Sequence, residues 1–198
     1  FAFSDPGLLA AVIAAHQRGV RVRVMLNPAR RSGEAANEAT HKKLAQAGVE
    51  VIDTNPEFDV THEKSMVIDA ATAVVHSANW EPKNLTETRD YAVFTSHPHE
   101  VSEIYACFDA DWHRKPFNPG ESAHLIWCNL NGRNRVARFI DQAQESLLLE
   151  NERYQDEVII ERLVRAAHRG VKIHVLARPP HSLKKGKLIE GVEGLRIL

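Results

Sequence analysis

Apolar residues recur with helical spacing close to the start of the chain. Asp5-Pro6 is typical of a helix start, because the acid can cap the first turn and proline fits the first helical position. The pattern that follows has one apolar face, made by Leu8, Leu9, Val12, Ile13 and Ala15. Gly19 is expected to end this helix, and alternating residues 20–26 predict a strand after it.

The same order of elements continues along the chain. Residues 34–47 predict a second helix that Gly48 ends, and residues 49–52 predict a short strand. Helices that alternate with short strands are typical of an α/β fold, which we therefore expect, with a mixed sheet flanked by helices.

Residues 61–80 read THEKSMVIDAATAVVHSANW and predict a β-hairpin. Two short apolar runs flank Asp69-Ala70-Ala71-Thr72, which we interpret as a four-residue turn. If Ile68 and Ala73 close this turn as partners, one face of the hairpin presents four polar side chains, because side chains alternate along a strand. These side chains are His62, Lys64, Ser77 and Asn79.

Part of the chain repeats at an offset of 151 residues. Residues 5, 15, 18, 19, 20, 24 and 28 are identical to residues 156, 166, 169, 170, 171, 175 and 179. Because these identities fall within one helix–strand unit, we predict a structural repeat.

The second copy has elements that the first lacks. Before Asp156 we expect a strand at 124–128, a helix at 134–144 and a strand at 146–149. We therefore expect two incomplete repeats. The first is 1–120, without its first strand and helix, and the second is 121–198, which ends before a hairpin of its own.

Composition limits the classes of function. The chain has 198 residues, 43% of them hydrophobic, and a formal net charge of −1. This charge gives no bulk electrostatic reason to bind nucleic acid. Two cysteines make no disulfide framework, and no apolar run approaches the roughly 20 residues of a membrane-spanning helix.

The hairpin residues resemble the phospholipase D superfamily, and in particular bacterial cardiolipin synthase-like proteins. H-E-K-S-M-V-I-D matches the signature H-x-K-x4-D of that family, and Ser77-Ala78-Asn79 matches the S-x-N that follows it. Two further segments fit, namely Asn84-Leu85-Thr86-Glu87 and the helix with Phe108 and Trp112. His76 departs from the family, which usually has glycine before the serine.

The resemblance implies a fold of two pseudo-twofold-related repeats and a reaction without metal or other cofactor. His62 would attack phosphorus and form a phosphohistidine, while Lys64 and Asn79 hold the nonbridging oxygens. Ser77 would add a hydroxyl, and the general acid would be the histidine of a second motif.

Two carboxylates have supporting parts in this interpretation. Glu87 would orient His62, by its place after the S-x-N motif, since a partner must fix the tautomer of an attacking imidazole. Asp69 would be a structural residue at the turn.

Three other interpretations of single residues are weaker. Zinc held by His97 and His99 with His62 or His76 lacks a recognised ligand spacing. Ser77 has no G-x-S-x-G elbow and is not expected to be a hydrolase nucleophile. Lys184 and Lys185 could steer an anionic headgroup, although such a run is more often a solvated loop.

The first expectation for function is phosphodiester hydrolysis or phosphatidyl transfer on a phospholipid, in the cytoplasm or at the inner face of a bacterial membrane. A nuclease of the same superfamily is the first alternative, and it predicts activity that falls steeply with salt. The second is a non-catalytic or truncated module. A homodimer could supply a second His62, and the sequence leaves the oligomeric state open.

Overall fold

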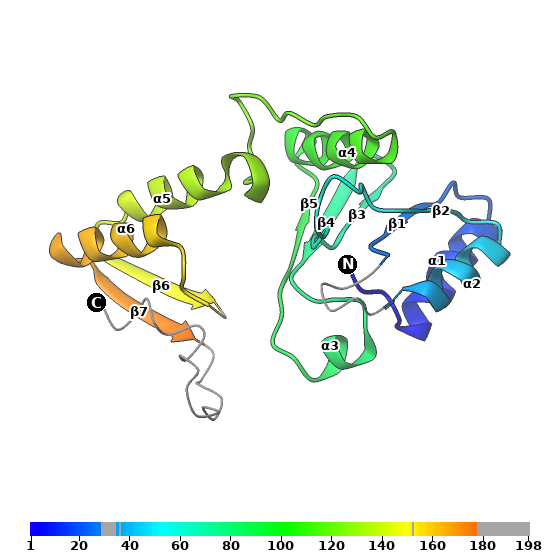
Figure 1. Cartoon of the computed structure of the whole chain (residues 1–198), viewed down its shortest axis with the longest axis horizontal. Helices are drawn as coiled ribbons and strands as arrows, with labels where there is room; N and C mark the ends of the chain where they lie inside the picture. The colour runs from blue at the N-terminus through cyan, green and yellow to red at the C-terminus, as the bar shows by residue number, and fades with distance from the viewer. Residues whose placement is uncertain (29–34, 36, 152, 178–198) are drawn as a thin grey trace. The chain divides into compact units, whose positions relative to one another are not determined.

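The computed structural model of the chain describes residues 1–28, 35, 37–151 and 153–177 (Figure 1). The chain divides into two compact units, Phe1–Leu125 and Ile126–Leu198. Each unit contains parallel or antiparallel strand pairs together with helices, so the expected α/β class is confirmed.

The first unit begins with two helices beside a parallel strand pair. Helix α1 is Pro6–Gln17 and α2 is Glu38–Gln46, and strand β1 (Arg23–Leu26) pairs with β2 (Glu50–Asp53). Both predicted helix–strand pairs are therefore present. A common core packs between them, made by Phe3, Leu9, Leu26, Leu44 and Val49.

The first unit continues with an antiparallel sheet of three strands. Its order is β3 (Ser65–Ile68), β4 (Thr72–His76) and β5 (Ala92–Thr95). Helix α3 (Pro82–Thr86) lies between β4 and β5 in sequence, and helix α4 (Pro98–Trp112) follows β5.

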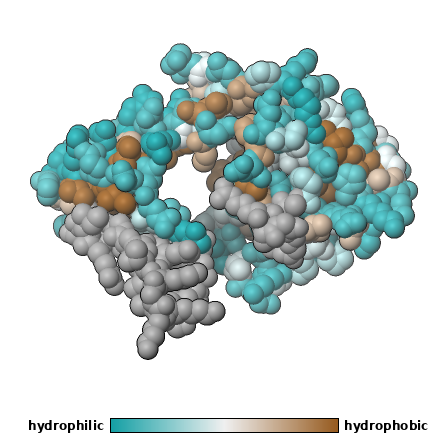
Figure 2. Space-filling view, viewed as in Figure 1, coloured by the Kyte–Doolittle hydropathy of each residue, from teal (hydrophilic) through white to brown (hydrophobic). Residues whose placement is uncertain are grey.

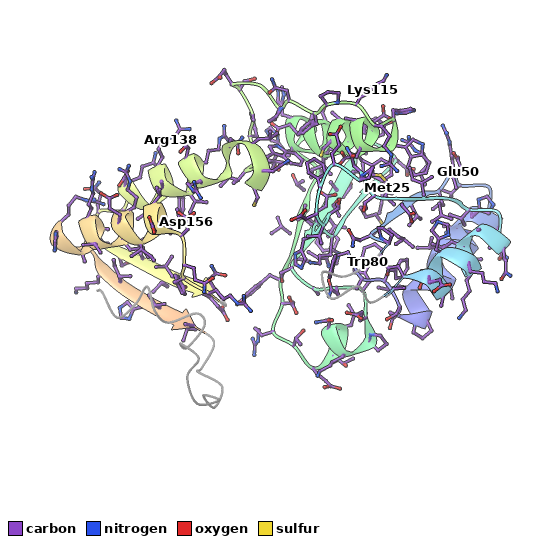
Figure 3. The ribbon with its side chains drawn as sticks, in the orientation of Figure 1. Met25, Glu50, Trp80, Lys115, Arg138 and Asp156 are labelled. Carbon is purple, nitrogen blue, oxygen red and sulfur yellow. The ribbon has the colours of Figure 1, made fainter. Side chains whose placement is uncertain are left out.

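The strand expected at residues 1–4 is reduced to one parallel bridge, between Phe3 and Trp80. Two backbone amides, of Ser4 and Asp5, donate to the same carbonyl of Trp80, at 2.8 and 2.9 Å, and turn the chain into α1. Trp80, labelled in Figure 3, thereby joins the start of the chain to the end of the hairpin.

The described residues of the second unit include a parallel strand pair and two α-helices. Strand β6 (Ser146–Asn151) pairs with β7 (Lys172–Ala177), and the helices are α5 (Arg133–Asp141) and α6 (Glu157–His168). Residues that face the viewer on these helices in Figure 2 are mainly hydrophilic. None of the helices in the described part of the chain has the length and apolar character to cross a bilayer.

The strand expected at 124–128 is wrong. Cys128–Gly132 instead form a π-helical turn, in which the Trp127 carbonyl accepts from the amides of Leu130, Asn131 and Gly132 at 2.9–3.0 Å. The Trp127 amide donates to Oδ1 of Asn131 at 2.8 Å. Because these polar groups are satisfied locally, the segment needs no partner strand.

The helix–strand units related by the offset of 151 share their caps. Oδ1 of Asp5 accepts from the Leu8 amide, and Oδ1 of Asp156, labelled in Figure 3, accepts from Val158 and Ile159. Gly19 and Gly170 end the two helices with φ of 91° and 90°. The wider division into repeats at residue 120 stays a prediction, and Pro179 lies outside the described residues.

The shared caps predict matched losses of stability. Asp5→Ala and Asp156→Ala should each lower the free energy of unfolding by about 0.5–2 kcal/mol, because each leaves first-turn amides unpaired. Urea denaturation followed by circular dichroism measures the loss. Asp156→Asn is the control, since asparagine caps as well and loses only the exposed ion pair to Arg133. A loss as large in Asp156→Asn as in Asp156→Ala would refute the capping explanation.

Candidate active site

The hairpin forms, but its register differs by one residue from the predicted one. Ile68 pairs with Thr72, so three residues rather than four make the turn. Asp69 and Ala70 have φ of 54° and 51°, and the Ala71 amide donates to the Ile68 carbonyl at 3.0 Å. These are the features of a type I′ turn. Asp69 is at the turn, as predicted.

This register corrects the expected arrangement of polar side chains. The His76 amide donates to the Lys64 carbonyl at 2.8 Å, so Lys64 lies opposite His76 and not opposite Ser77. A shift of one residue exchanges the faces of a strand, so the single face with all four side chains is wrong. The regular strands also end at Ser65 and His76, and other contacts place the residues beyond them.

His62 and Lys64 are in direct contact. Nζ of Lys64 lies 3.0 Å from Nδ1 and 3.3 Å from Nε2 of His62. An ammonium group can only donate, so the ring nitrogen that it bonds must carry a lone pair. The imidazole of His62 is exposed, whereas Lys64 is only 7% exposed. The pair thus places an exposed imidazole directly beside a buried cation.

An aromatic ring lies against both members of this pair. The ring of Phe1 lies 4.7 Å from that of His62, centroid to centroid, and Nζ of Lys64 is 5.4 Å from the Phe1 centroid. A cation at this distance from the face of a ring is attracted to it. Phe1 therefore holds His62 and Lys64 together while it shields the ammonium from water.

Burial lowers the pKa of Lys64 from 10.5 to about 8, and the charge of Asp90 opposes this shift. The ammonium is therefore mainly charged at neutral pH. It can stabilise negative charge on a phosphoryl oxygen next to His62, and poor hydration makes that attraction stronger than it would be in water.

Asp90 binds the hydroxyl of Ser77 and also interacts with the charge of Lys64. Its carboxylate accepts from Oγ of Ser77 at 2.6 Å and from Oγ1 of Thr88 at 2.5 Å. These two hydrogen bonds, with a smaller contribution from Lys64, lower the pKa of Asp90. Ser77 Oγ also accepts from the Tyr91 amide at 3.0 Å. Ser77 is thus bound to the carboxylate, and a substrate must compete with Asp90 for its proton.

Asp90 was missed by the sequence reasoning, which chose Glu87 as the supporting carboxylate. Glu87 is exposed at the C-terminal end of α3, and its role as the residue that orients His62 stays a prediction. The register of β4 with β5 pairs His76 with Ala92. Continued by one residue, that register pairs Ser77 with Tyr91, and Asp90 is the residue directly before Tyr91, so the strand pairing was the signal that could have found it.

Asn79 is held by a neighbour on its own loop. Its Nδ2 donates to Oε2 of Glu81 at 3.2 Å. In the part of the chain that the structure describes, Oδ1 of Asn79 and Nε1 of Trp80 are buried without a hydrogen bond. An amide NH₂ has two donors, so holding a phosphoryl oxygen, as the motif implies, would use the second N–H of Asn79 beside the one bound to Glu81.

His76 fits the position where the family usually has glycine. The non-glycine residues with positive φ among those described are Asp69, Ala70 and Arg114, so His76 has an ordinary strand conformation. Its ring packs edge-on against Trp80, with centroids 5.8 Å apart, and burial lowers its pKa. The substitution therefore adds packing and no backbone strain.

Two further hypotheses from the sequence concern a lysine pair that could bind substrate and a zinc site made by histidines. Lys184 and Lys185 lie outside the described residues. His97 and His99 do not meet His62 or His76 in a metal-ligand cluster; the cluster found among the described residues is His97, Glu100 and His124.

Comparison with known proteins identifies a matching family and several proteins of similar sequence. Residues 1–112 match the family described as cardiolipin synthase, PLD-like domain. Polyphosphate kinase of Vibrio parahaemolyticus is 28% identical over 210 residues, which cover 98% of this chain and 30% of the kinase. Human mitochondrial cardiolipin hydrolase is 32% identical over 120 residues, which cover 60% of this chain and 45% of the hydrolase. The chain thus spans less than half the length of either relative.

Two solved structures share the fold. Polyphosphate kinase from Porphyromonas gingivalis superimposes with a TM-score of 0.66 and 19% identity, over 91% of this chain and 33% of the kinase. The phospholipase D family member Nuc from Salmonella typhimurium gives 0.52 and 22%, over 58% of this chain and 75% of Nuc. The expected phospholipase D-like fold is therefore confirmed.

The surroundings of Lys64 predict how its pKa responds to substitution. Asp90→Asn should lower the pKa of Lys64 below about 8, because it removes the charge that supports the ammonium. Titration of the Lys64 side chain by NMR measures this directly. Asp109→Asn, which changes an exposed carboxylate bound to Arg23, is the control and should leave the Lys64 midpoint where it is. An unchanged midpoint in Asp90→Asn would show that Asp90 does not act on Lys64.

The same shift gives a pH dependence of stability. Between pH 8 and 10.5 the unfolded chain holds a proton on Lys64 that the folded chain has lost. Stability should therefore rise with pH through this window, and Lys64→Met should reduce the rise.

Proposed function

The chain belongs to the family of cardiolipin synthase, PLD-like domains, and from this we propose that it carries out phosphoryl-group chemistry through a covalent phosphohistidine at His62. The observation that supports this most is the contact of the His62 ring nitrogens with the buried ammonium of Lys64, at 3.0 and 3.3 Å. A nucleophile and a cation for the developing charge are thereby joined before substrate binds.

The proposed reaction has two displacements at phosphorus. In the first, the lone pair of a His62 ring nitrogen forms a P–N bond while the P–O bond to the leaving alcohol breaks, and the alcohol oxygen takes a proton. In the second, water or an acceptor alcohol attacks phosphorus, loses its proton and breaks the P–N bond. Lys64 faces the nonbridging oxygens in both steps. The family assigns the proton transfers to the histidine of a second motif, whereas this sequence contains one H-x-K-x4-D.

A phospholipid is the substrate class we propose first. The matched family is described by cardiolipin synthase, and the relative with 32% identity is a cardiolipin hydrolase. The net charge of −1 gives no general attraction for nucleic acid, so the nuclease alternative is less favoured. Action on a lipid would bring the protein to a membrane surface, with the cytoplasmic face as the proposed location.

A second candidate is phosphoryl transfer with polyphosphate. One observation favours it: the similarity to polyphosphate kinase covers 98% of the chain and so includes both units, whereas the family match ends at residue 112. The same His62–Lys64 pair would serve, because attack on a phosphoanhydride also leaves a phosphohistidine. The two candidates differ in what His62 carries, an ester-linked phosphate or an unesterified phosphoryl group.

His62→Ala should abolish covalent labelling and lower turnover by at least about 10³-fold, because the nucleophile is removed. The measurement compares cardiolipin in vesicles, a chromogenic phosphodiester and polyphosphate with ATP, each followed by acid-labile phosphoprotein and product release. His168→Ala changes an exposed histidine on α6 and is the matched control, expected to react like the original chain.

The substrates separate the candidates. Turnover and lipid-labelled protein with cardiolipin alone would support the lipid proposal, and labelling from polyphosphate or ATP alone would support the second candidate. Labelling that persists in His62→Ala would refute both. A chain that turns over none of the three substrates would favour the non-catalytic alternative.

A further inference from the structure

A cluster of histidines lies on the first unit at the end of β5. The N-cap residue of α4 is His97, and His99 and Glu100 follow in the first turn. His124 comes from the last residues of the same unit, 24 positions after Glu100 in sequence. Two segments distant in sequence thus bring imidazoles to one place.

The potential ligand atoms of three residues converge. One atom from each of His97, Glu100 and His124 lies within 4.8 Å of the others. Ligands around a tetrahedral zinc ion at about 2.1 Å are roughly 3.4 Å apart, so small side-chain rotations would close the set. The ring of His99 stacks on that of His124, with centroids 5.1 Å apart and an angle of 29°.

Neighbouring side chains hold two of these ligands in position. Oγ1 of Thr95 donates to Oε2 of Glu100 and accepts from the His97 amide, the latter at 3.1 Å. One hydroxyl thereby links the strand end to both ligands of the helix. Hydrogen bonds that orient ligating carboxylates and histidines are a regular part of metal sites.

The third ligand is positioned through the backbone. The carboxylate of Glu103, on α4, accepts from the amides of His124 and Leu125. The returning segment is therefore fastened to the same helix that carries His97 and Glu100. This contact matters because the 11 residues between the end of α4 and His124 contain no helix or strand of their own.

From this geometry we propose that His97, Glu100 and His124 bind one divalent transition-metal ion, with zinc as the ion that two imidazoles and one carboxylate suit best. A water molecule or His99 completes four ligands. The ligand set differs from the one that the sequence suggested, since neither His62 nor His76 takes part. The negative charge of Glu100 offsets the unfavourable positive end of the α4 dipole.

The proposed ion is structural and lies apart from the His62 chemistry. Asp90 precedes β5 and His97 follows it, so the two sites are at opposite ends of that strand. Bound metal would fix the segment before Leu125 to the start of α4. It would thereby strengthen the contact that Glu103 makes, and it supplies nothing to the phosphohistidine reaction.

The test uses the full chain without an affinity tag, stripped with EDTA and titrated with Zn²⁺ by calorimetry. We expect one ion per chain and a rise in melting temperature on binding. Cobalt should give the visible absorption of a tetrahedral site. His97→Ala and His124→Ala should each weaken zinc binding at least about tenfold, and Thr95→Val, which disturbs only the support of the ligands, by about tenfold.

Matched controls separate this site from general histidine binding. His113→Ala changes an exposed histidine at the other end of α4 and should bind zinc as the original chain does. His62→Ala should also bind normally. Equal affinity in His97→Ala, His124→Ala and His113→Ala would overturn the proposal, as would loss of binding in His62→Ala. Melting curves of the metal-free variants identify any variant that fails to fold. If His97→Ala or His124→Ala fails, the zinc affinity of the other one decides whether the proposal stands.

Discussion

The candidate active site depends on the burial of the Lys64 ammonium. A cation with 7% exposure loses hydration and must be compensated by its neighbours. Three parts of the first unit supply this: His62 from the same segment, Asp90 from the segment before β5, and the ring of Phe1. Phe1 is itself positioned by Asn37, whose buried amide donates to the Phe1 carbonyl. Separate parts of the first unit thus place compensating groups around the Lys64 ammonium.

This burial links the electrostatics to the chemistry. A fully hydrated lysine would interact weakly with a phosphoryl oxygen, and a deeply buried one without partners would lose its proton. A pKa of about 8 lies between these limits, so the ammonium stays charged at neutral pH in poorly hydrated surroundings. A bound phosphate would replace part of the lost hydration. The same residue therefore lowers the stability of the empty site and favours an anionic group beside His62.

The sequence was sufficient for most of the helices and strands, because periodicity and caps are local features, although the strand that it predicted at 124–128 is absent. It was insufficient for the register, which depends on positive φ at Asp69 and Ala70. Asp-Ala is not typical of a type I′ turn, whereas Asp-Gly or Asn-Gly would have predicted one. The wrong register led directly to the wrong prediction that four polar side chains share one face of the hairpin. Asp90 was missed for a related reason, since its contact with Ser77 arises only once β5 is paired with β4.

The pairing beyond the regular strands also explains which parts of the site are fixed. The Ser77 amide donates to the Tyr91 carbonyl at 2.9 Å and the Tyr91 amide donates to Ser77 Oγ, so the β4–β5 pairing continues as far as Tyr91, the residue after Asp90. On the other strand the ladder ends at the Lys64 carbonyl. His62 lies two residues further and is exposed. The carboxylate and the ammonium therefore lie beside paired backbone, whereas the proposed nucleophile lies beyond the ladder, where Lys64 and Phe1 contact its ring.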